Sequence, residues 1–193
     1  ELDSSTLKGL VLDLRNNPGG LLQKAIEVSE IFLQKGQLIL ETRGRARNSD
    51  RDFISQRVNN TDLYPLVVVI NPTSASASEI VAGAIQDHDR GLIVGETSFG
   101  KGLVQSVYPL GRQAGLALTT QKWYTPSGRL IQRDYSKISD YDYYNQNRNA
   151  SRQPSEEDIK YSDLGRVVYG GGGITPDHSV PAAELNDFQD RIA

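Results

Sequence analysis

Residues 66–80 read LVVVINPTSASASEI, the most informative stretch of this 193-residue chain. The continuous β-branched run at 66–70 is typical of a strand buried on both faces of a sheet, and Asn71-Pro72 ends it. From residue 76 to residue 86 the apolar side chains recur at helical spacing, and a second short apolar run follows at 92–94. Strand, helix and strand in this order predict a βαβ unit with a parallel sheet, and therefore an α/β fold.

The residues before this unit predict another strand and helix. The apolar run at 10–14 breaks at the turn sequence RNNPGG, residues 15–20, and indicates a buried strand that enters a sharp turn. Helical spacing of apolar residues follows from Leu22, and Gly36 is a suitable C-terminal cap. Residues 38–40 predict a strand. Residues 43–60 contain five arginines and predict an exposed loop or a strand pair.

The residues after the unit predict further strands at 104–108 and 115–124, bounded by proline and glycine turn signals. Residues 134–163 are rich in Asp, Tyr, Asn, Gln and Ser and carry few aliphatic side chains, so we expect a polar surface excursion there. Residues 167–169 predict a returning strand, and the glycine run and GITPD sequence behind it predict a loop.

Length and composition restrict the possible functions. The chain is long enough for one main domain, and its 21 basic and 24 acidic side chains give a net charge of -3, which favours no nucleic-acid partner. No apolar run is long enough to predict a membrane span. With no cysteine and only two histidines, we expect neither a metal site nor a cofactor.

Ser76 lies at the predicted junction of a strand with a helix. Such a junction places a side chain at the carboxyl end of the sheet, beside the unpaired N–H groups and the positive dipole end of the helix. It suits a nucleophile and its oxyanion. The serines and the threonine of this segment also suit ordinary helix capping, so position alone does not separate the two interpretations.

A serine nucleophile needs a base, and Lys101 is a better candidate than either histidine, although His178 stays open and a single loop lysine is more often simply solvated. His88 lies at the far end of the same predicted helix, roughly 18 Å from Ser76 at about 1.5 Å per residue. His178 lies in a loop segment typical of ordinary surface. Lys101 stands between two glycines that let the backbone bend closely, and burial in an apolar slot beside Phe99 and Leu103 would favour the neutral amine that a base requires.

Residues 95–101 also match most of the phosphate-loop pattern G-x-x-x-x-G-K-[ST]. Gly102 replaces the hydroxyl residue that would hold magnesium, and the residues after it predict strands where a nucleotide-binding fold requires a helix. We therefore disfavour nucleotide binding.

Three separated segments carry a family resemblance: DLRNNPGG at 13–20, SASASE at 74–79, and residues 95–105 with GE at 95–96 and FGKG at 99–102. Together they resemble the C-terminal processing peptidases, also called tail-specific proteases. The resemblance extends from about residue 7 to residue 124, and GGGITPD at 171–177 is similar to the closing Gly-Ile-x-Pro-Asp segment of that family. The fold it implies is a crotonase/ClpP-like βαβ core with a parallel sheet plus additional C-terminal strands.

The resemblance also implies the site residues. Ser76 is the nucleophile, Lys101, twenty-five positions later, is the base, and Gln105 orients the lysine. The backbone N–H of Ala77 and one from the pair Gly19-Gly20, with Gly20 preferred, form the oxyanion hole, because glycines let the chain approach a scissile carbonyl closely. If residues 101–105 form a strand, positions 101 and 105 share a face.

The implied protein is a serine endopeptidase that cleaves substrates at or near apolar C-termini in a bacterial cell envelope, in the periplasm or otherwise outside the cytoplasm. On this interpretation residues 1–193 are its catalytic core, residues 1–6 are the exit from an upstream PDZ domain, and that domain captures the substrate tail. Two alternatives remain open: a crotonase-like acyl-thioester enzyme, which shares the glycine-based oxyanion hole, and a non-catalytic scaffold of the same fold. Neither requires Ser76, Lys101 and Gln105 together.

Overall fold

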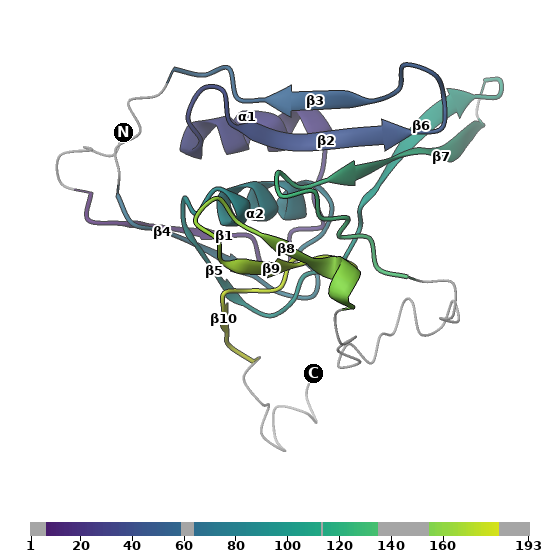
Figure 1. The fold of residues 1–193 in the computed structure, drawn as a ribbon. Helices are drawn as coiled ribbons and strands as arrows, with labels where there is room; N and C mark the ends of the chain where they lie inside the picture. The colour runs from purple at the N-terminus through teal and green to yellow at the C-terminus, as the bar shows by residue number, and fades with distance from the viewer. Residues whose placement is uncertain (1–6, 59–63, 113, 135–154, 182–193) are drawn as a thin grey trace, which may run out of the picture.

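The computed structural model describes residues 7–58, 64–112, 114–134 and 155–181, and it contains the predicted parallel sheet (Figure 1). Strands β1 (Leu10–Asp13), β4 (Leu66–Ile70), β5 (Leu92–Gly95) and β10 (His178–Ser179) lie side by side in the order β1-β4-β5-β10, and all pair in parallel. Helix α2 (Ala77–Asp87) connects β4 to β5. The predicted βαβ unit and the α/β class are therefore confirmed.

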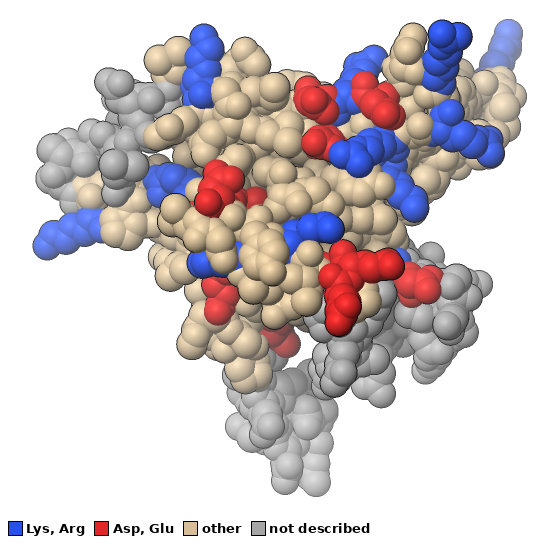
Figure 2. Space-filling model, in the orientation of Figure 1, with Lys and Arg blue, Asp and Glu red and all other residues tan. Residues whose placement is uncertain are grey.

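A second, antiparallel sheet has the strand order β3-β2-β7-β6. Its strands are β3 (Arg51–Ile54), β2 (Leu38–Gly44), β7 (Gly115–Tyr124) and β6 (Leu103–Pro109). Residues 43–60 were predicted to be an exposed loop or a strand pair, and the described part contains both. Residues 43–44 end β2 and residues 51–54 form its hairpin partner β3, while residues 45–50 form the loop between them. Figure 2 shows basic side chains over the end of this hairpin, where Arg45 and Arg47 are exposed.

Helix α1 (Leu22–Phe32) ends earlier than predicted. The predicted cap, Gly36, has a positive φ of 93° and lies in the turn that enters β2, where its N–H donates to the carbonyl of Ser55. Leu33 caps the helix instead, because its extended backbone leaves the helix while its N–H still bonds to Ser29. The glycine therefore shapes the following turn and does not stop the helix.

The C-terminal part of the described chain contains a 3₁₀ helix at Glu156–Asp158, then β8 (Ile159–Tyr161) and β9 (Val167–Tyr169), which pair antiparallel. Strand β9 is the predicted returning strand. Strand β10 was not predicted, since it comprises two residues with no apolar pattern. The predicted exit segment 1–6 lies outside the described residues, and of the predicted excursion 134–163 only residue 134 and residues 155–163 lie within them.

Helix α2 lies between the two sheets, where it contacts β5, β2 and α1 (Figure 1). Ten of its eleven residues are buried, so it forms the centre of the core. The largest fully buried apolar side chains around it come from both sheets, from the residue that caps α1 and from the loop before β10, and they include Trp123, Leu33, Ile39, Leu40, Ile70, Ile93 and Ile174. Because α2 is packed on all sides, the residues of its first turn have a fixed position.

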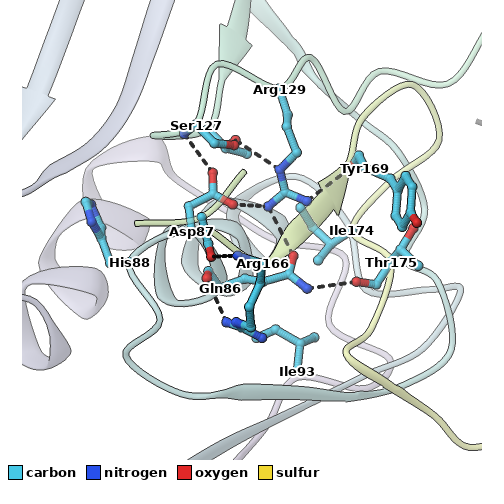
Figure 3. Close-up of polar contacts among 12 residues, drawn as sticks. Gln86, Asp87, His88, Ile93, Ser127, Arg129, Arg166, Tyr169, Ile174 and Thr175 are labelled. Carbon is cyan, nitrogen blue, oxygen red and sulfur yellow. Dashed lines mark hydrogen bonds and ion pairs between the residues drawn. The ribbon is translucent and has the colours of Figure 1, made fainter. Parts of the chain in front are cut away.

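A buried polar network holds residues 170–177, here called the closing segment, against the C-terminal end of α2 (Figure 3). Arg129 is fully buried, pairs with the Asp87 carboxylate and donates to the carbonyl of Tyr169 at 3.0 Å, just before this segment. Gln86 donates from its side chain to the carbonyl of Thr175 at 2.9 Å. The helix therefore positions the closing segment through side-chain contacts.

Candidate active site

Ser76 lies where β4 meets α2, at the N-cap position of the helix. Its φ of 54° is rare for a residue with a side chain. This backbone conformation costs about 1–3 kcal/mol and persists only where the surrounding structure enforces it. The turn is enforced from one side by Glu79, whose Oε2 accepts the Ser76 N–H at 2.7 Å. A strained backbone that presents a half-buried serine at a helix N-terminus is typical of a functional position.

The loop after β1 encloses the turn from the other side. Asn17 accepts the backbone N–H of Ala75 at 3.0 Å and the Ser78 hydroxyl at 3.0 Å through its carbonyl oxygen, and the Ser74 hydroxyl donates to the Leu14 carbonyl at 2.8 Å. The hydroxyls of Ser74 and Ser78 are therefore engaged in holding this loop.

Gly19 has to be glycine for two reasons. Its φ is 95°, and a Cβ atom at this position would lie 2.5 Å from the Ala75 carbonyl oxygen and 2.7 Å from the Ala77 nitrogen. The close approach brings the predicted glycine pair directly against the first residue of α2.

Glu79 connects the turn at Ser76 to the loop after β5. It is fully buried in the first turn of α2. Oε1 accepts the Ser98 hydroxyl and the Gly100 N–H, both at 2.6 Å, while Oε2 accepts the N–H of Lys101 at 2.9 Å besides that of Ser76. Four donors on two oxygens suit an ionised carboxylate, which only accepts hydrogen bonds.

The pKa of Glu79 reflects two opposed influences. Burial raises this pKa above the ordinary value for a glutamate, because it disfavours the charged form. The hydrogen bonds from the Ser98 hydroxyl and from the backbone of Lys101, Gly100 and Ser76 oppose that rise. The donors therefore hold the charged form in a place that would otherwise favour protonation.

Lys101 is fixed through both of its peptide groups. Its N–H donates to Glu79, and its carbonyl accepts the indole N–H of Trp123 at 3.2 Å. Trp123 in turn donates its backbone N–H to the Gly102 carbonyl at 3.0 Å. The main chain on either side of the lysine side chain is thus tied to the helix and to β7.

A cavity of about 260 Å³ gathers five of the six predicted site residues. Ser76, Lys101, Gln105, Ala77 and Gly20 all line it, whereas Gly19 lies beneath, against the turn. The other lining residues are apolar and are Leu21, Leu22, Ile80, Leu103, Val104 and Trp123. The site therefore combines a hydroxyl, an amine and an amide within an apolar surround.

The two backbone N–H groups predicted for the oxyanion hole, those of Ala77 and Gly20, are free to bind a ligand. Among the described residues, neither the Ala77 N–H nor the Gly20 N–H has an acceptor, while the Gly19 N–H donates to the Asn17 side chain at 2.9 Å. Between the two glycines, Gly20 is therefore the one with an available donor.

The structure departs from the expected surroundings of Lys101 in two details. Lys101 is exposed at the rim of the cavity and not buried in an apolar slot beside Phe99 and Leu103. Lys101 and Gln105 also do not share a regular strand, because β6 begins at Leu103 and its register shifts between Val104 and Gln105. The shift is a β-bulge, and both side chains still line the cavity.

The sequence interpretation gave no role to Glu79 or Trp123. The spacing Ser76-x-x-Glu79 before an apolar helix is the capping-box signature, and it could have indicated the contact between the Glu79 side chain and the Ser76 backbone. Its bonds to Ser98, Gly100 and Lys101 leave no local signal, because those residues lie 19 to 22 positions away.

His88 lies away from the cavity. Its ring contacts Asp163 and the Leu38 carbonyl, each at 2.7 Å. No group of three or more potential metal ligands occurs within residues 7–58, 64–112, 114–134 and 155–181. In that same part of the chain, none of the helices has the length and apolar character needed to cross a membrane.

Comparison with known proteins gives a consistent result. The sequence model of peptidase family S41 matches residues 1–141. The carboxy-terminal-processing protease of Bartonella bacilliformis is 54% identical over 132 residues, which are 68% of this chain and 30% of that protein. The carboxy-terminal processing protease CtpB of Bacillus subtilis is 35% identical over 168 residues, which are 85% of this chain and 35% of that protein.

Solved structures agree with these relatives. The photosystem II D1 C-terminal processing protease superimposes with a TM-score of 0.62 at 29% identity, covering 92% of this chain and 36% of that one. An S41 protease from Bacteroides fragilis shares the fold, with a TM-score of 0.61 at 15% identity, over 91% of this chain and 38% of the other. The chain spans about a third of the length of the relatives it matches.

A Glu79→Gln variant tests the role of the carboxylate in this geometry. An amide NH₂ must face at least one backbone N–H, such as that of Gly100, so one charge-assisted bond is lost. Loss of a bond worth about 1.5–3 kcal/mol should slow labelling of Ser76 by a fluorophosphonate roughly 10- to 100-fold. The fold should survive, because the variant no longer buries a charge.

The measurement is the labelling rate by intact mass, together with thermal unfolding. The matched control is Glu27→Gln, since Glu27 is an exposed helical glutamate whose only described ion pair is with Lys24. Labelling of Glu79→Gln at the wild-type rate would contradict the proposal that the Glu79 carboxylate holds the backbones of Ser76 and Lys101 in place.

Proposed function

The chain belongs to peptidase family S41, and on that basis we propose that it is the catalytic core of a serine endopeptidase that cleaves proteins at or near their C-termini. The observation that carries the proposal is the shared cavity, which Ser76, Lys101 and Gln105 all line together with Ala77 and Gly20, whose N–H groups have no acceptor among the described residues. The names of the relatives support the carboxy-terminal preference.

The first half of the reaction forms an acyl-enzyme. The Ser76 Oγ attacks the scissile carbonyl carbon while its proton passes to the Nζ of Lys101. Negative charge develops on the carbonyl oxygen and is stabilised by the N–H groups of Ala77 and Gly20, assisted by the N-terminal dipole of α2. The C–N bond then breaks, and Lys101 returns the proton to the leaving amine.

The second half releases the product. Water attacks the acyl carbon and gives a proton to Lys101, and the same two N–H groups stabilise the second oxyanion. The Ser76 Oγ leaves and recovers its proton from Lys101. Gln105 orients the amine throughout, because a neutral amide can hydrogen-bond to lysine without holding it charged as a carboxylate would.

The exposure of Lys101 gives substrate binding a role in catalysis. A lysine accepts a proton only as the neutral amine, and removing an amine from water disfavours its ammonium form. An apolar substrate segment that fills the space between Leu22, Ile80 and Trp123 would exclude solvent from the cavity. Binding and base activation are coupled in this way.

The substrates we propose are proteins and peptides with apolar C-termini, in keeping with the apolar cavity lining. From the resemblance, we assign capture of the terminal carboxylate to an upstream PDZ domain of the full-length protein. The same resemblance, together with bacterial relatives, supports a location in the bacterial cell envelope, outside the cytoplasm.

Substitution of Ser76 by alanine tests the proposed nucleophile. Ser76→Ala should abolish cleavage of an apolar-tailed protein and labelling by a fluorophosphonate, because no other hydroxyl faces both Lys101 and Ala77 in this account. Ser78→Ala is the matched control, since its hydroxyl donates to the Asn17 carbonyl and its loss should cost about 1 kcal/mol of stability.

Mass spectrometry of the labelled protein and a cleavage assay provide the measurements. The acyl-thioester alternative and the scaffold alternative both predict that wild type is not labelled at Ser76. Activity retained in Ser76→Ala and lost in Ser78→Ala would exclude the assignment.

Lys101→Arg tests the proposed base. A guanidinium stays protonated at any workable pH and cannot accept the serine proton, although its charge and length resemble those of lysine. We expect a folded protein with at least a hundredfold lower turnover. Lys24→Arg, an exposed substitution on α1, controls for the replacement itself. Wild-type turnover by Lys101→Arg would rule out a Ser-Lys dyad.

A further inference from the structure

Ser98 is a buried serine that does not reach the cavity. It lies between β5 and β6, is fully buried, and is absent from the cavity lining. Its hydroxyl donates to Glu79 Oε1 at 2.6 Å and accepts the backbone N–H of Ile174 at 2.7 Å. One hydroxyl therefore links the carboxylate anchor of the site to the closing segment, residues 170–177.

The backbone of Ser98 makes the same connection. Its N–H donates to the Ile174 carbonyl at 3.1 Å, and its carbonyl accepts from Arg133, which also donates to the Gly172 carbonyl. Gly173 approaches so closely that a Cβ atom there would lie 2.4 Å from the Ser98 carbonyl oxygen. The closing segment thus packs main chain to main chain against the loop that carries Lys101.

We propose that Ser98 is a positioning residue that couples the closing segment to Ser76 and Lys101 through Glu79. The inference rests on the proposed function, since it assigns Ser98 to the preparation of that dyad. Glu79 holds the N–H groups of Ser76 and Lys101, and Ser98 holds Glu79, so the two reacting segments depend on a residue that touches neither substrate nor reacting atoms.

The two ends of α2 give this coupling its geometry. At the C-terminal end, Gln86 holds the Thr175 carbonyl, and Arg129 holds the Tyr169 carbonyl just before the closing segment (Figure 3). At the N-terminal end, Ile174 reaches Glu79 through the Ser98 hydroxyl. The closing segment is therefore linked to both ends of α2, and a shift of that segment acts on the Glu79 carboxylate through the Ser98 hydroxyl.

The charge of Glu79 responds to the Ser98 hydroxyl. Burial raises the pKa of Glu79, and the hydrogen bond from Ser98 is the leading influence that lowers it. Without this donor the pKa rises further, so Glu79 protonates at a higher pH. A protonated carboxyl donates one hydrogen bond and no longer accepts all four of its present donors.

The first arm of the test needs no catalytic activity. The ¹³Cδ resonance of Glu79 is followed against pH in the 193-residue chain, in wild type, in Ser98→Ala and in Ser98→Cys, which keeps the shape and supplies only a weak donor. We expect the Glu79 midpoint at a higher pH in both variants, and further displaced in Ser98→Ala. If Ser98→Ala does not fold, Ser98→Cys alone decides the outcome.

The second arm measures the rate at which a fluorophosphonate labels Ser76 at neutral pH. We expect a loss of roughly tenfold or more in Ser98→Ala and a smaller loss in Ser98→Cys. The control is Ser29→Ala, which removes an equally buried hydroxyl that donates only within α1, to the Ala25 carbonyl. It should lower thermal stability without moving the Glu79 midpoint or the labelling rate.

The two arms distinguish failure of the proposed coupling from failure of the proposed function. An unchanged Glu79 midpoint in both Ser98 variants overturns the coupling, and so does a displaced midpoint with wild-type labelling of Ser76. Wild-type protein that is not labelled at Ser76 at any pH instead shows that the proposed function has failed, and the titration arm still reports whether Ser98 controls Glu79.

Discussion

The site depends on one buried carboxylate that the protein holds with neutral donors. Glu79 accepts hydrogen bonds from the turn between β4 and α2 and from the loop after β5. Strands β4 and β5 are adjacent and parallel. Carboxyl ends of neighbouring parallel strands meet at one edge of a sheet, so a single side chain in the first turn of the crossover helix can reach both. Ser76 and Lys101 stand together because this carboxylate holds their backbones.

The buried Glu79 and the strained Ser76 backbone both lower the stability of the fold. Burial raises the pKa of Glu79, so stability linked to its titration is fully present below the ordinary pKa of a glutamate and declines as the pH rises through the raised folded value. The positive φ of Ser76 adds backbone strain. The buried helix α2 and the Arg129–Asp87 network over its other end offset these costs.

Local patterns predicted most of the fold. The β-branched run at Leu66–Ile70 and the helical spacing after it report burial directly, and so the βαβ unit followed from sequence. Strand β10 did not, because two residues carry no period. Gly19, Gly20 and Ser76 were predicted from the segments DLRNNPGG and SASASE and from the family resemblance that these carry. The proposed role of Ser98, in contrast, depends on a contact with Ile174, 76 positions away. The exposure of Lys101 depends on how β6 and β7 border the cavity, which no local pattern encodes.

The most direct measurement is a crystal structure of the chain after Ser76 has reacted with a peptidyl phosphonate. The account predicts a phosphorus–Oγ bond at Ser76, a phosphonyl oxygen that accepts the N–H groups of Ala77 and Gly20, and a Glu79 carboxylate that keeps all four of its donors. Phosphorus on another residue, or a phosphonyl oxygen turned away from both N–H groups while Glu79 has lost Ser76 or Lys101, would contradict it.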